Sequence, residues 1–489
     1  MTTDTTEGAT TALVVPFAGP GLGRVPLNWG QRTIWEGIRW LGEDRHYYNI
    51  RRTLPVPSLA PAAAVAALRT LVERHQALRT YFTDGSSDGT GGPVQDVRAE
   101  GKFTVAVRHA PTAEAAAETA AALLAEQGGR PFEAGQWPVR FCLVMVADRV
   151  KFLNMVLDHQ TADGSGAALV VEQLTALLND RPADETPGQA PDPAPARWQP
   201  LDQAEYETAG EGARRGKLSL EYWRRQLAVV PLTMFDMPPR EPEEQRFWKV
   251  RLTSPAAAVA ATRIAERTGR TTSAVLLTAT SLVLSRLTGH TTGVLQLIVA
   301  NRFDDNRRAL VSELCQDGLF VLDRTGVATF DGLVEAAYRS ALVTYRYGFY
   351  DRVERDALIA RVAAERGGAI RLSSYFNDAR LSDDWSAIPK AATADELRAL
   401  TAESETDVLG KWERQEPTFF LAANECAYAC RISLLSDTAF ISVAETGAAL
   451  RAIEAALVAA AFEDVSLTAA LAASDLAPIP RPTGTEAAS

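Results

Sequence analysis

The stretch VLDHQTADGSGAALVVEQL, residues 156–174, holds the side chains of this chain that are best placed to do chemistry. An apolar run ends on Asp158 and His159, and Asp163 and Gly164 follow before a helical pattern begins. Histidine is the side chain whose ordinary pKa lies closest to neutral pH, so it can take up and release a proton under mild conditions. His159 is therefore a candidate general base at a strand-to-helix junction.

The alternation of residues before His159 predicts the direction of its side chain. Successive side chains of a strand point to opposite faces, which places Asp158 and Val156 on the face away from His159. The residues that share the face of His159 are apolar, namely Leu153, Met155 and Leu157. Asp163 is placed to cap the helix that follows. A hydrogen-bonded structural histidine with a capping aspartate is the alternative that spacing alone leaves open.

Regular elements on either side would hold this stretch in place. Residues 139–159 read as two strands joined by a tight turn at 147–149. Residues 60–78 predict a helix with one apolar face, formed by Leu68, Leu71, Val72 and His75. Ser254 followed by Pro255 predicts the start of another helix. The alternating segment TAFISVAE, residues 438–445, predicts a strand.

Proline-rich residues between two long regions predict the domain organisation. We expect a disordered tail over 1–15, an N-terminal subdomain over 16–182, a linker over 183–200, a C-terminal subdomain over 201–476 and a second tail over 477–489. Helical and strand-like segments alternate in both large regions. This pattern favours an α/β fold in each.

Composition narrows the class of protein. The chain of 489 residues has 46% hydrophobic residues and a net charge of −11, so a nucleic-acid partner is not expected. The four cysteines indicate neither a disulfide framework nor a zinc site, so we expect no metal. The N-terminus lacks the features of a signal peptide. The apolar run at 271–287 is too short to span a bilayer. We therefore expect no membrane association and a cytoplasmic location.

The segment DHQTADG resembles the His-His-x-x-x-Asp-Gly signature of nonribosomal peptide condensation domains and their acyltransferase relatives. Further motifs of that family occur in the right order, in PLNWGQRTIWEGIRWL (26–41), RHQALRTYF (74–82), LEYWRRQL (220–227) and IVANRFDDNRRALVSELCQDGLFVLDR (298–324). The resemblance implies two chloramphenicol-acetyltransferase-like subdomains in a V-shaped pseudo-dimer, with the histidine in a central substrate tunnel.

The resemblance also implies roles for individual residues. His159 matches the catalytic histidine, and Asp163 matches a structural aspartate that pairs with an arginine, here Arg302. Gly164 matches a glycine that lets substrate or backbone come close. Asp158 departs from the family, because the first histidine of the signature usually stands there, and Asn301 replaces the usual glycine before the arginine.

Two further residues are weaker candidates for the substrate tunnel. These are Phe303 and Asn377, for which packing and a strand-end cap are the simpler interpretations. Ser165 lacks the G-x-S-x-G context of a nucleophilic serine, so a covalent intermediate is not expected.

The implied reaction joins an acyl or aminoacyl thioester to a small-molecule amine or hydroxyl acceptor, giving an amide or an ester in natural-product biosynthesis. The substrate would be held on the phosphopantetheine of a separate peptidyl or acyl carrier protein, and no bound cofactor is expected. One alternative is an acyl-CoA-dependent O-acyltransferase, and another is a non-catalytic recruitment domain. A cyclising variant is also open, because Asp158 and Asp163 satisfy the Asp-x-x-x-x-Asp spacing of that type. An epimerising variant is a further possibility.

Overall fold

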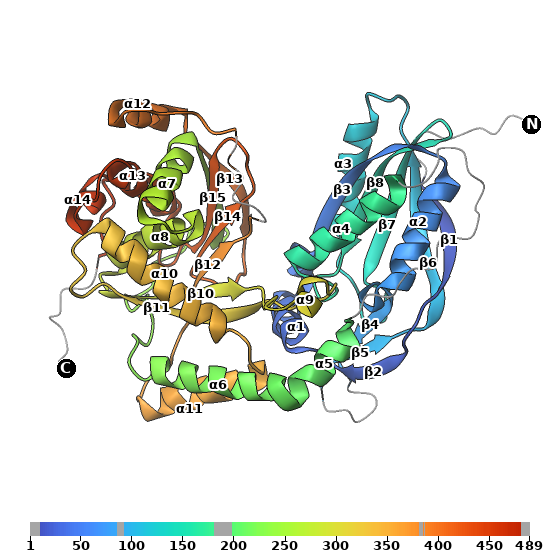
Figure 1. Ribbon diagram of the computed structural model, residues 1–489, viewed down its shortest axis with the longest axis horizontal. Helices are drawn as coiled ribbons and strands as arrows, with labels where there is room; N and C mark the ends of the chain where they lie inside the picture. Colours follow the sequence, from blue (N-terminus) through green and yellow to red (C-terminus); the bar gives the residue numbers. More distant parts are fainter. Residues whose placement is uncertain (1–9, 86–91, 180–197, 381–384, 386, 481–489) are drawn as a thin grey trace, which may run out of the picture. The chain divides into compact units, whose positions relative to one another are not determined.

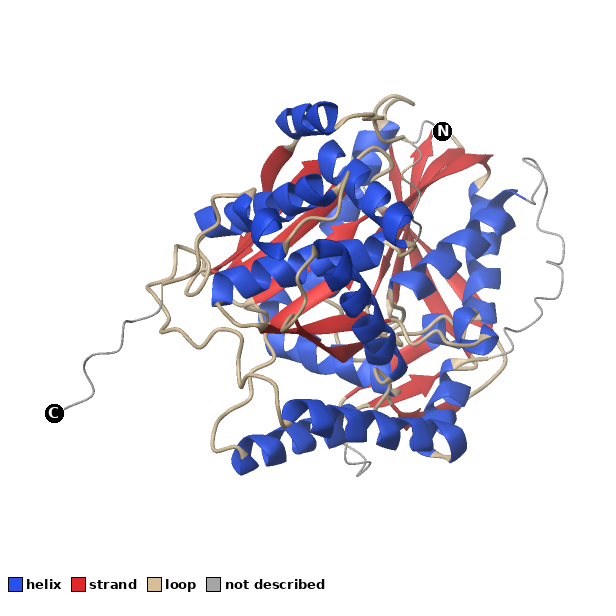
Figure 2. Ribbon diagram, turned by 60° about the vertical axis from the view of Figure 1, so that its left-hand side comes forward, coloured by secondary structure: helices blue, strands red, loops and turns tan. Residues whose placement is uncertain are grey.

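The computed structural model describes most of the chain, in the ranges 10–85, 92–179, 198–380, 385 and 387–480. Its contacts divide the chain into two compact units. The first comprises Met1–Arg214 and Ala300–Gln316, and the second comprises Arg215–Val299 and Asp317–Ser489. Both contain sheets and helices, as expected, and Figure 2 shows the strands and helices of the chain in separate colours.

The first unit is built on a five-stranded sheet. Its strands run in the order β1 (Thr11–Ala18), β6 (Glu100–His109), β7 (Val139–Val146), β8 (Arg149–Leu157) and β3 (Ile50–Leu59). Strand β8 is antiparallel to both of its neighbours, with Leu157 opposite Val139 and Ile50. The strand that leads to His159 is therefore an interior strand, held on both sides.

Helices cover both faces of this sheet (Figure 1). Helices α2 (Pro61–Arg74) and α4 (Gly164–Asn179) contact each other on one face, and α3 (Ala116–Gly128) packs against the other. Leu153, Met155 and Leu157 of β8 belong to the core beneath α2 and α4. Asn154 lies on the α3 side, where its amide donates to the carbonyl of Ala120. The alternation read from the sequence is confirmed along β8.

The remaining elements of the first unit surround this core. A three-stranded sheet runs in the order β2 (Gly23–Pro26), β5 (Val94–Val97) and β4 (Thr80–Thr83). The short and peripheral helices are α1 (Trp29–Leu41), η1 (Gly42–Tyr48), η2 (Gln76–Arg79), α5 (Pro200–Thr208) and α9 (Asp305–Arg308).

The second unit has its own seven-stranded sheet and core. The strands run in the order β11 (Gln316–Asp323), β10 (Thr292–Val299), β12 (Ser374–Asp378), β14 (Phe419–Asn424), β15 (Cys430–Asp437), β9 (Phe247–Ser254) and β13 (Glu405–Trp412). The helices are α6 (Gly210–Leu227), which begins in the first unit, α7 (Pro255–Thr268), α8 (Thr272–Thr288), α10 (Phe330–Arg346), α11 (Arg352–Glu365), α12 (Ala394–Ala399), η3 (Leu400–Glu403), α13 (Val443–Ala460) and α14 (Leu467–Ala472). The predicted start of α7 is confirmed, since the Ser254 hydroxyl accepts from the amide of Ala257.

The segment at 438–445 differs from its prediction, because it does not form a strand. Strand β15 ends at Asp437, whose carboxylate accepts from the amide of Ala439. Ser442 and Glu445 then form a capping box that starts α13. The alternating apolar residues of 438–445 therefore lie in the loop after β15 and in the first turn of helix α13.

The domain boundaries also differ in part from those expected. Residues 11–15 are not a disordered tail, because they pair with β6. At the other end, Ile479 is buried and its amide donates to the carbonyl of Leu287. Most of the expected linker, through residue 197, lies outside the described residues. Residues 201–214 and 300–316, expected in the C-terminal subdomain, group with the first unit.

Candidate functional site

The junction after β8 has little freedom, because its polar groups are hydrogen-bonded. The Asp158 amide donates to the carbonyl of Pro138 at 2.9 Å, and the Thr161 amide donates to the carbonyl of Asp158 at 2.9 Å. Asp163 then caps α4, since its Oδ1 accepts from the amide of Gly166 at 2.7 Å. His159 is held in the turn between these contacts.

Asp163 and Arg302 form the expected ion pair, and both side chains are buried. Arg302 Nη2 lies 2.6 Å from Asp163 Oδ1, and the two side chains are 8% and 1% exposed. Asp163 Oδ2 also accepts from the amide of Leu314 at 3.3 Å. The arginine donates further to main-chain carbonyls, those of Arg307, Leu310 and Ser312. Because residues 300–316 belong to the first unit, the pair is internal to that unit.

Glycine allows close packing at position 166 rather than at position 164. A Cβ atom added at Gly164 would meet no described atom within 4 Å, whereas one added at Gly166 would lie about 3.2 Å from Arg302 Nη2 and the Ser312 carbonyl. The close backbone approach expected at Gly164 is therefore found two residues later. Room for a substrate at Gly164 stays a prediction.

Glu313 is the charged neighbour of His159 that sequence reasoning missed. Its Oε2 lies 2.6 Å from Nδ1 of His159, and its Oε1 accepts from the amide of Cys315 at 2.6 Å. The Glu313 side chain is 2% exposed, while that of His159 keeps 26% of its surface. No local pattern marked Glu313. Its position between Arg302 and the following strand, in a segment that matched a family motif, was the only available signal.

The paired charges determine how easily His159 takes up a proton. Burial by itself lowers the pKa of His159, but the charge and the hydrogen bond of Glu313 outweigh it, so the pKa is raised above its ordinary 6.5. Burial raises the pKa of Glu313, and the interaction with His159 partly offsets that shift. A carboxylate at Nδ1 favours the tautomer that carries its proton on that nitrogen, which leaves Nε2 as the basic atom.

The segment that carries Glu313 is fixed against the start of α1. Asn28 caps α1, and its amide nitrogen donates to the Ser312 hydroxyl at 2.9 Å. A Cβ atom at Gly30 would lie 2.6 Å from the carbonyl oxygen of Glu313, so this helix start approaches too closely for any other residue. The first family motif thus positions the segment beside His159.

The departure at Asn301 has a simple backbone explanation. Asn301 has a φ of 54°, in the left-handed region where glycine is favoured and asparagine is tolerated. Its side-chain nitrogen donates to the carbonyl of Leu314 at 3.1 Å, which adds a contact that glycine cannot make. The replacement therefore preserves the turn before Arg302.

Asp158 lies with Gln160 in the lining of a cavity of the first unit, and His159 is not among the lining residues. Asp158 Oδ1 accepts from the amide of Gln160 at 2.9 Å. Burial raises the pKa of Asp158, while the Gln160 amide and the neighbouring charges lower it in part. The hydrogen bonds of the Asp158 carboxylate therefore go to Gln160, and His159 acts on it through its charge alone.

The two weaker candidates lie in different units. Phe303 follows Arg302 in the first unit, where the guanidinium of Arg307 lies 4.6 Å from its ring centre. Asn377 lies in β12 of the second unit, opposite Ala422 of β14. Their assignment to a substrate tunnel stays a prediction.

One cluster of the described residues has the atoms to hold a cation. Potential ligand atoms of Asp163, Glu313 and Cys315 lie within 4.8 Å of one another. The carboxylates already accept from Arg302, His159 and main-chain amides. Burial raises the pKa of the Cys315 thiol well above its usual range, and a protonated thiol is a poor metal ligand. The geometry therefore fits an acid–base site better than a metal centre.

The two α/β units have the fold expected of the chloramphenicol-acetyltransferase-like superfamily. Residues 23–320 match the model of the condensation domain. The chain therefore belongs to the condensation-domain family of nonribosomal peptide and polyketide biosynthesis. No helix of the described residues has both the length and the apolar character that crossing a bilayer requires.

Comparison with individual proteins agrees with this membership. The chain is 30% identical over 288 residues to the phosphinothricin tripeptide synthetase PhsC of Streptomyces viridochromogenes, a match that covers 57% of this chain and 26% of PhsC. Its fold resembles the condensation domain of the monacolin K polyketide synthase MokA, with a TM-score of 0.68 at 15% identity, covering 92% of this chain and all of that one. A structure described for condensation domain-mediated chain release from the enacyloxin polyketide synthase gives a TM-score of 0.63 at 19% identity, covering 96% and 86%.

The buried ion pair makes a prediction about stability. Replacing Asp163 by alanine leaves the guanidinium of Arg302 buried without its counter-ion, which typically costs about 3–5 kcal/mol. We expect Asp163→Ala to lower the free energy of unfolding by that order, measured by urea denaturation. Asp305→Ala is the matched control, because the carboxylate of Asp305 is 97% exposed and pairs with Arg308 in the same segment. An unchanged stability with lost activity would instead make Asp163 a catalytic group.

Proposed function

We propose that this protein joins an acyl or aminoacyl thioester, held on the phosphopantetheine of a separate carrier protein, to an amine or hydroxyl acceptor. The observation that carries the proposal is the contact of 2.6 Å between His159 and Glu313. Glu313 holds the imidazole by Nδ1 and is itself buried, while His159 keeps part of its surface open to a substrate. This is the arrangement of a base with its orienting carboxylate.

The reaction requires one proton to be moved and returned. Nε2 of His159 accepts the proton of the nucleophile as its nitrogen or oxygen forms a bond to the thioester carbonyl carbon. The carbon–sulfur bond then breaks, and the departing thiolate recovers the proton from the imidazolium. Glu313 stabilises the imidazolium between these steps, since opposite charges at this distance favour the protonated ring. The products are the amide or ester and the free phosphopantetheine thiol.

Carrier-bound donors and acyl-coenzyme A are both thioesters, so the donor must be tested directly. Mass spectrometry would follow an acyl group loaded on a purified carrier protein, with and without the enzyme and a candidate acceptor. Free acyl-coenzyme A with the same acceptor is the parallel arm. We expect transfer from the carrier protein. Faster turnover from acyl-coenzyme A without any carrier would contradict the proposal and favour an O-acyltransferase.

Removal of the base should suppress turnover while the fold remains. Proton transfer typically contributes about 10²–10⁴-fold to a rate, so His159→Ala should lower the turnover number by that order. His109 ends strand β6 and is exposed, so His109→Ala is a matched strand-end control that should leave the rate unchanged. Steady-state rates and circular dichroism check both variants. A His159→Ala rate within a few-fold of wild type would reject the base role.

The carboxylate of Glu313 predicts a pH dependence. The base must be neutral, so the rate increases as the pH rises through the pKa of His159, which Glu313 raises. Glu313→Gln removes the negative charge and keeps an acceptor. The pKa of His159 should therefore fall, and the acid limb of the turnover profile should move to lower pH. Glu313→Asp keeps the charge and should move the limb less. An acid limb unchanged in Glu313→Gln would show that Glu313 does not act through His159.

A further inference from the structure

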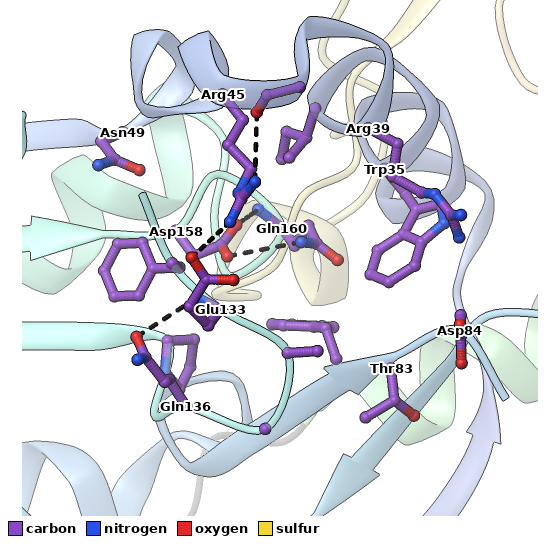
Figure 3. A pocket seen from close by; sticks show the side chains of 17 residues that line it. Trp35, Arg39, Arg45, Asn49, Thr83, Asp84, Glu133, Gln136, Asp158 and Gln160 are labelled. Atoms are coloured by element: carbon purple, nitrogen blue, oxygen red, sulfur yellow. Dashed lines mark hydrogen bonds and ion pairs between the residues drawn. The ribbon is translucent and has the colours of Figure 1, made fainter. Parts of the chain in front are cut away.

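A cavity of about 590 Å³ lies within the first unit (Figure 3), and neither His159 nor Glu313 is among the residues that line it. It is lined by α1, the end of β4, residues 132–138 and the turn that follows β8. A cavity of this size suits a small organic molecule. Its polar and aromatic lining residues indicate which chemical class it would take.

Gln160 supplies an unused hydrogen-bond acceptor in this lining. The residue is 4% exposed, and its Oε1 has no hydrogen-bond partner among the described residues. Its Nε2 lies 3.5 Å from Oδ2 of Asp158, which orients the amide. In Figure 3 the amide oxygen points away from Asp158 and towards Trp35. A buried polar atom without a protein partner is uncommon, and an N–H donor of a ligand in the cavity can satisfy it.

Asp158 places a negative charge beside that acceptor. The residue is 9% exposed, its Oδ1 accepts from the Gln160 amide and its Oδ2 has the long contact to Nε2, while His159 and Arg140 are its neighbouring charges. Two acceptors side by side, one of them a carboxylate, match a group that carries several N–H donors and a positive charge. A primary ammonium has three donors and no acceptor.

The arginines of the lining do not reverse this preference. The guanidinium of Arg45 lies 2.5 Å from Glu133 and also donates to the carbonyl of Gly42, so its charge is neutralised. Arg39 is exposed and lies 5.6 Å from the ring centre of Trp35. An exposed charge is screened by solvent, whereas the buried carboxylate of Asp158 acts at short range.

Aromatic rings supply the remaining wall. Trp35, Phe82 and Phe132 line the cavity. The guanidinium of Arg140 already covers the ring of Phe132 at 3.8 Å from its centre. The rings of Trp35 and Phe82 suit the apolar stem of a ligand whose head reaches Asp158 and Gln160.

We propose that this cavity binds a small organic molecule through a primary ammonium group, with Asp158 and Gln160 as acceptors and Trp35 and Phe82 against the apolar stem. The aspartate that replaces the first histidine of the family signature thereby acquires a binding role. This inference does not rest on the proposed acyl transfer, because binding can be measured without turnover.

Isothermal titration calorimetry of the full chain with 2-phenylethylammonium tests the proposal. We expect saturable binding, and at least about tenfold weaker binding for the N,N,N-trimethyl analogue, which keeps the charge but loses the donors. The neutral 2-phenylethanol should bind more weakly by a similar factor. Equal affinity for the trimethyl analogue, or no saturable binding of 2-phenylethylammonium, would overturn the proposal. Displacement by calcium chloride at lower concentration would assign the cavity to a metal ion instead and would also overturn it.

Substitutions of lining residues test whether 2-phenylethylammonium binds in this cavity. Asp158→Asn and Gln160→Met should each weaken the binding of 2-phenylethylammonium by about tenfold or more. Asp84→Asn is the matched control, because it removes the same charge from an exposed position of the same cavity and should change affinity less than about threefold. Thermal melts establish that each variant is folded, and if Asp158→Asn is not, Gln160→Met decides. An equal loss in Asp84→Asn would reduce the effect to general charge attraction and overturn the proposal.

Discussion

The buried ion pair between Asp163 and Arg302 is the contact on which the geometry of the site depends. It connects the cap of α4 to residues 300–316, which are more than a hundred positions away in the sequence. Removing both charges from water is costly, and the pair alone does not compensate for that cost. Amides of Gly166 and Leu314 donate to the carboxylate, and three main-chain carbonyls accept from the two Nη atoms of the guanidinium. The network specifies one arrangement of two distant segments.

The acid–base properties of His159 follow from that arrangement. Glu313 lies on the segment that Arg302 anchors, so the ion pair and the start of α1 together set the distance from carboxylate to imidazole. Burial alone would make His159 a weaker base, and the buried carboxylate reverses the direction of the shift. The two buried carboxylates therefore have different effects. Asp163 pairs with Arg302 and stabilises the turn. Glu313 contacts His159 and raises its pKa.

Local sequence patterns correctly predicted helices and strands that bury one face in the core. The two strands of residues 139–159 and the start of α7 are as expected, because alternation and capping act over a few neighbouring residues. The same kind of pattern was misleading at 438–445, where the capping box of Ser442 and Glu445 outweighs the apolar alternation. Residues 11–15, expected in a tail, pair with β6, and their β-branched apolar side chains suit a strand.

The sequence by itself determined that His159 lies at the junction after a buried strand, that Asp163 caps the next helix, and that the ordered motifs belong to the condensation family. Each of these follows from residues that are adjacent or from a matched motif. Only the tertiary structure decided that residues 300–316 join the first unit, that Glu313 meets His159, and that Asp158 lines a separate cavity. The partners of the His159 contact are 154 positions apart. Helical and strand periodicities extend over one element, so contacts at that separation are specified only when the whole chain packs.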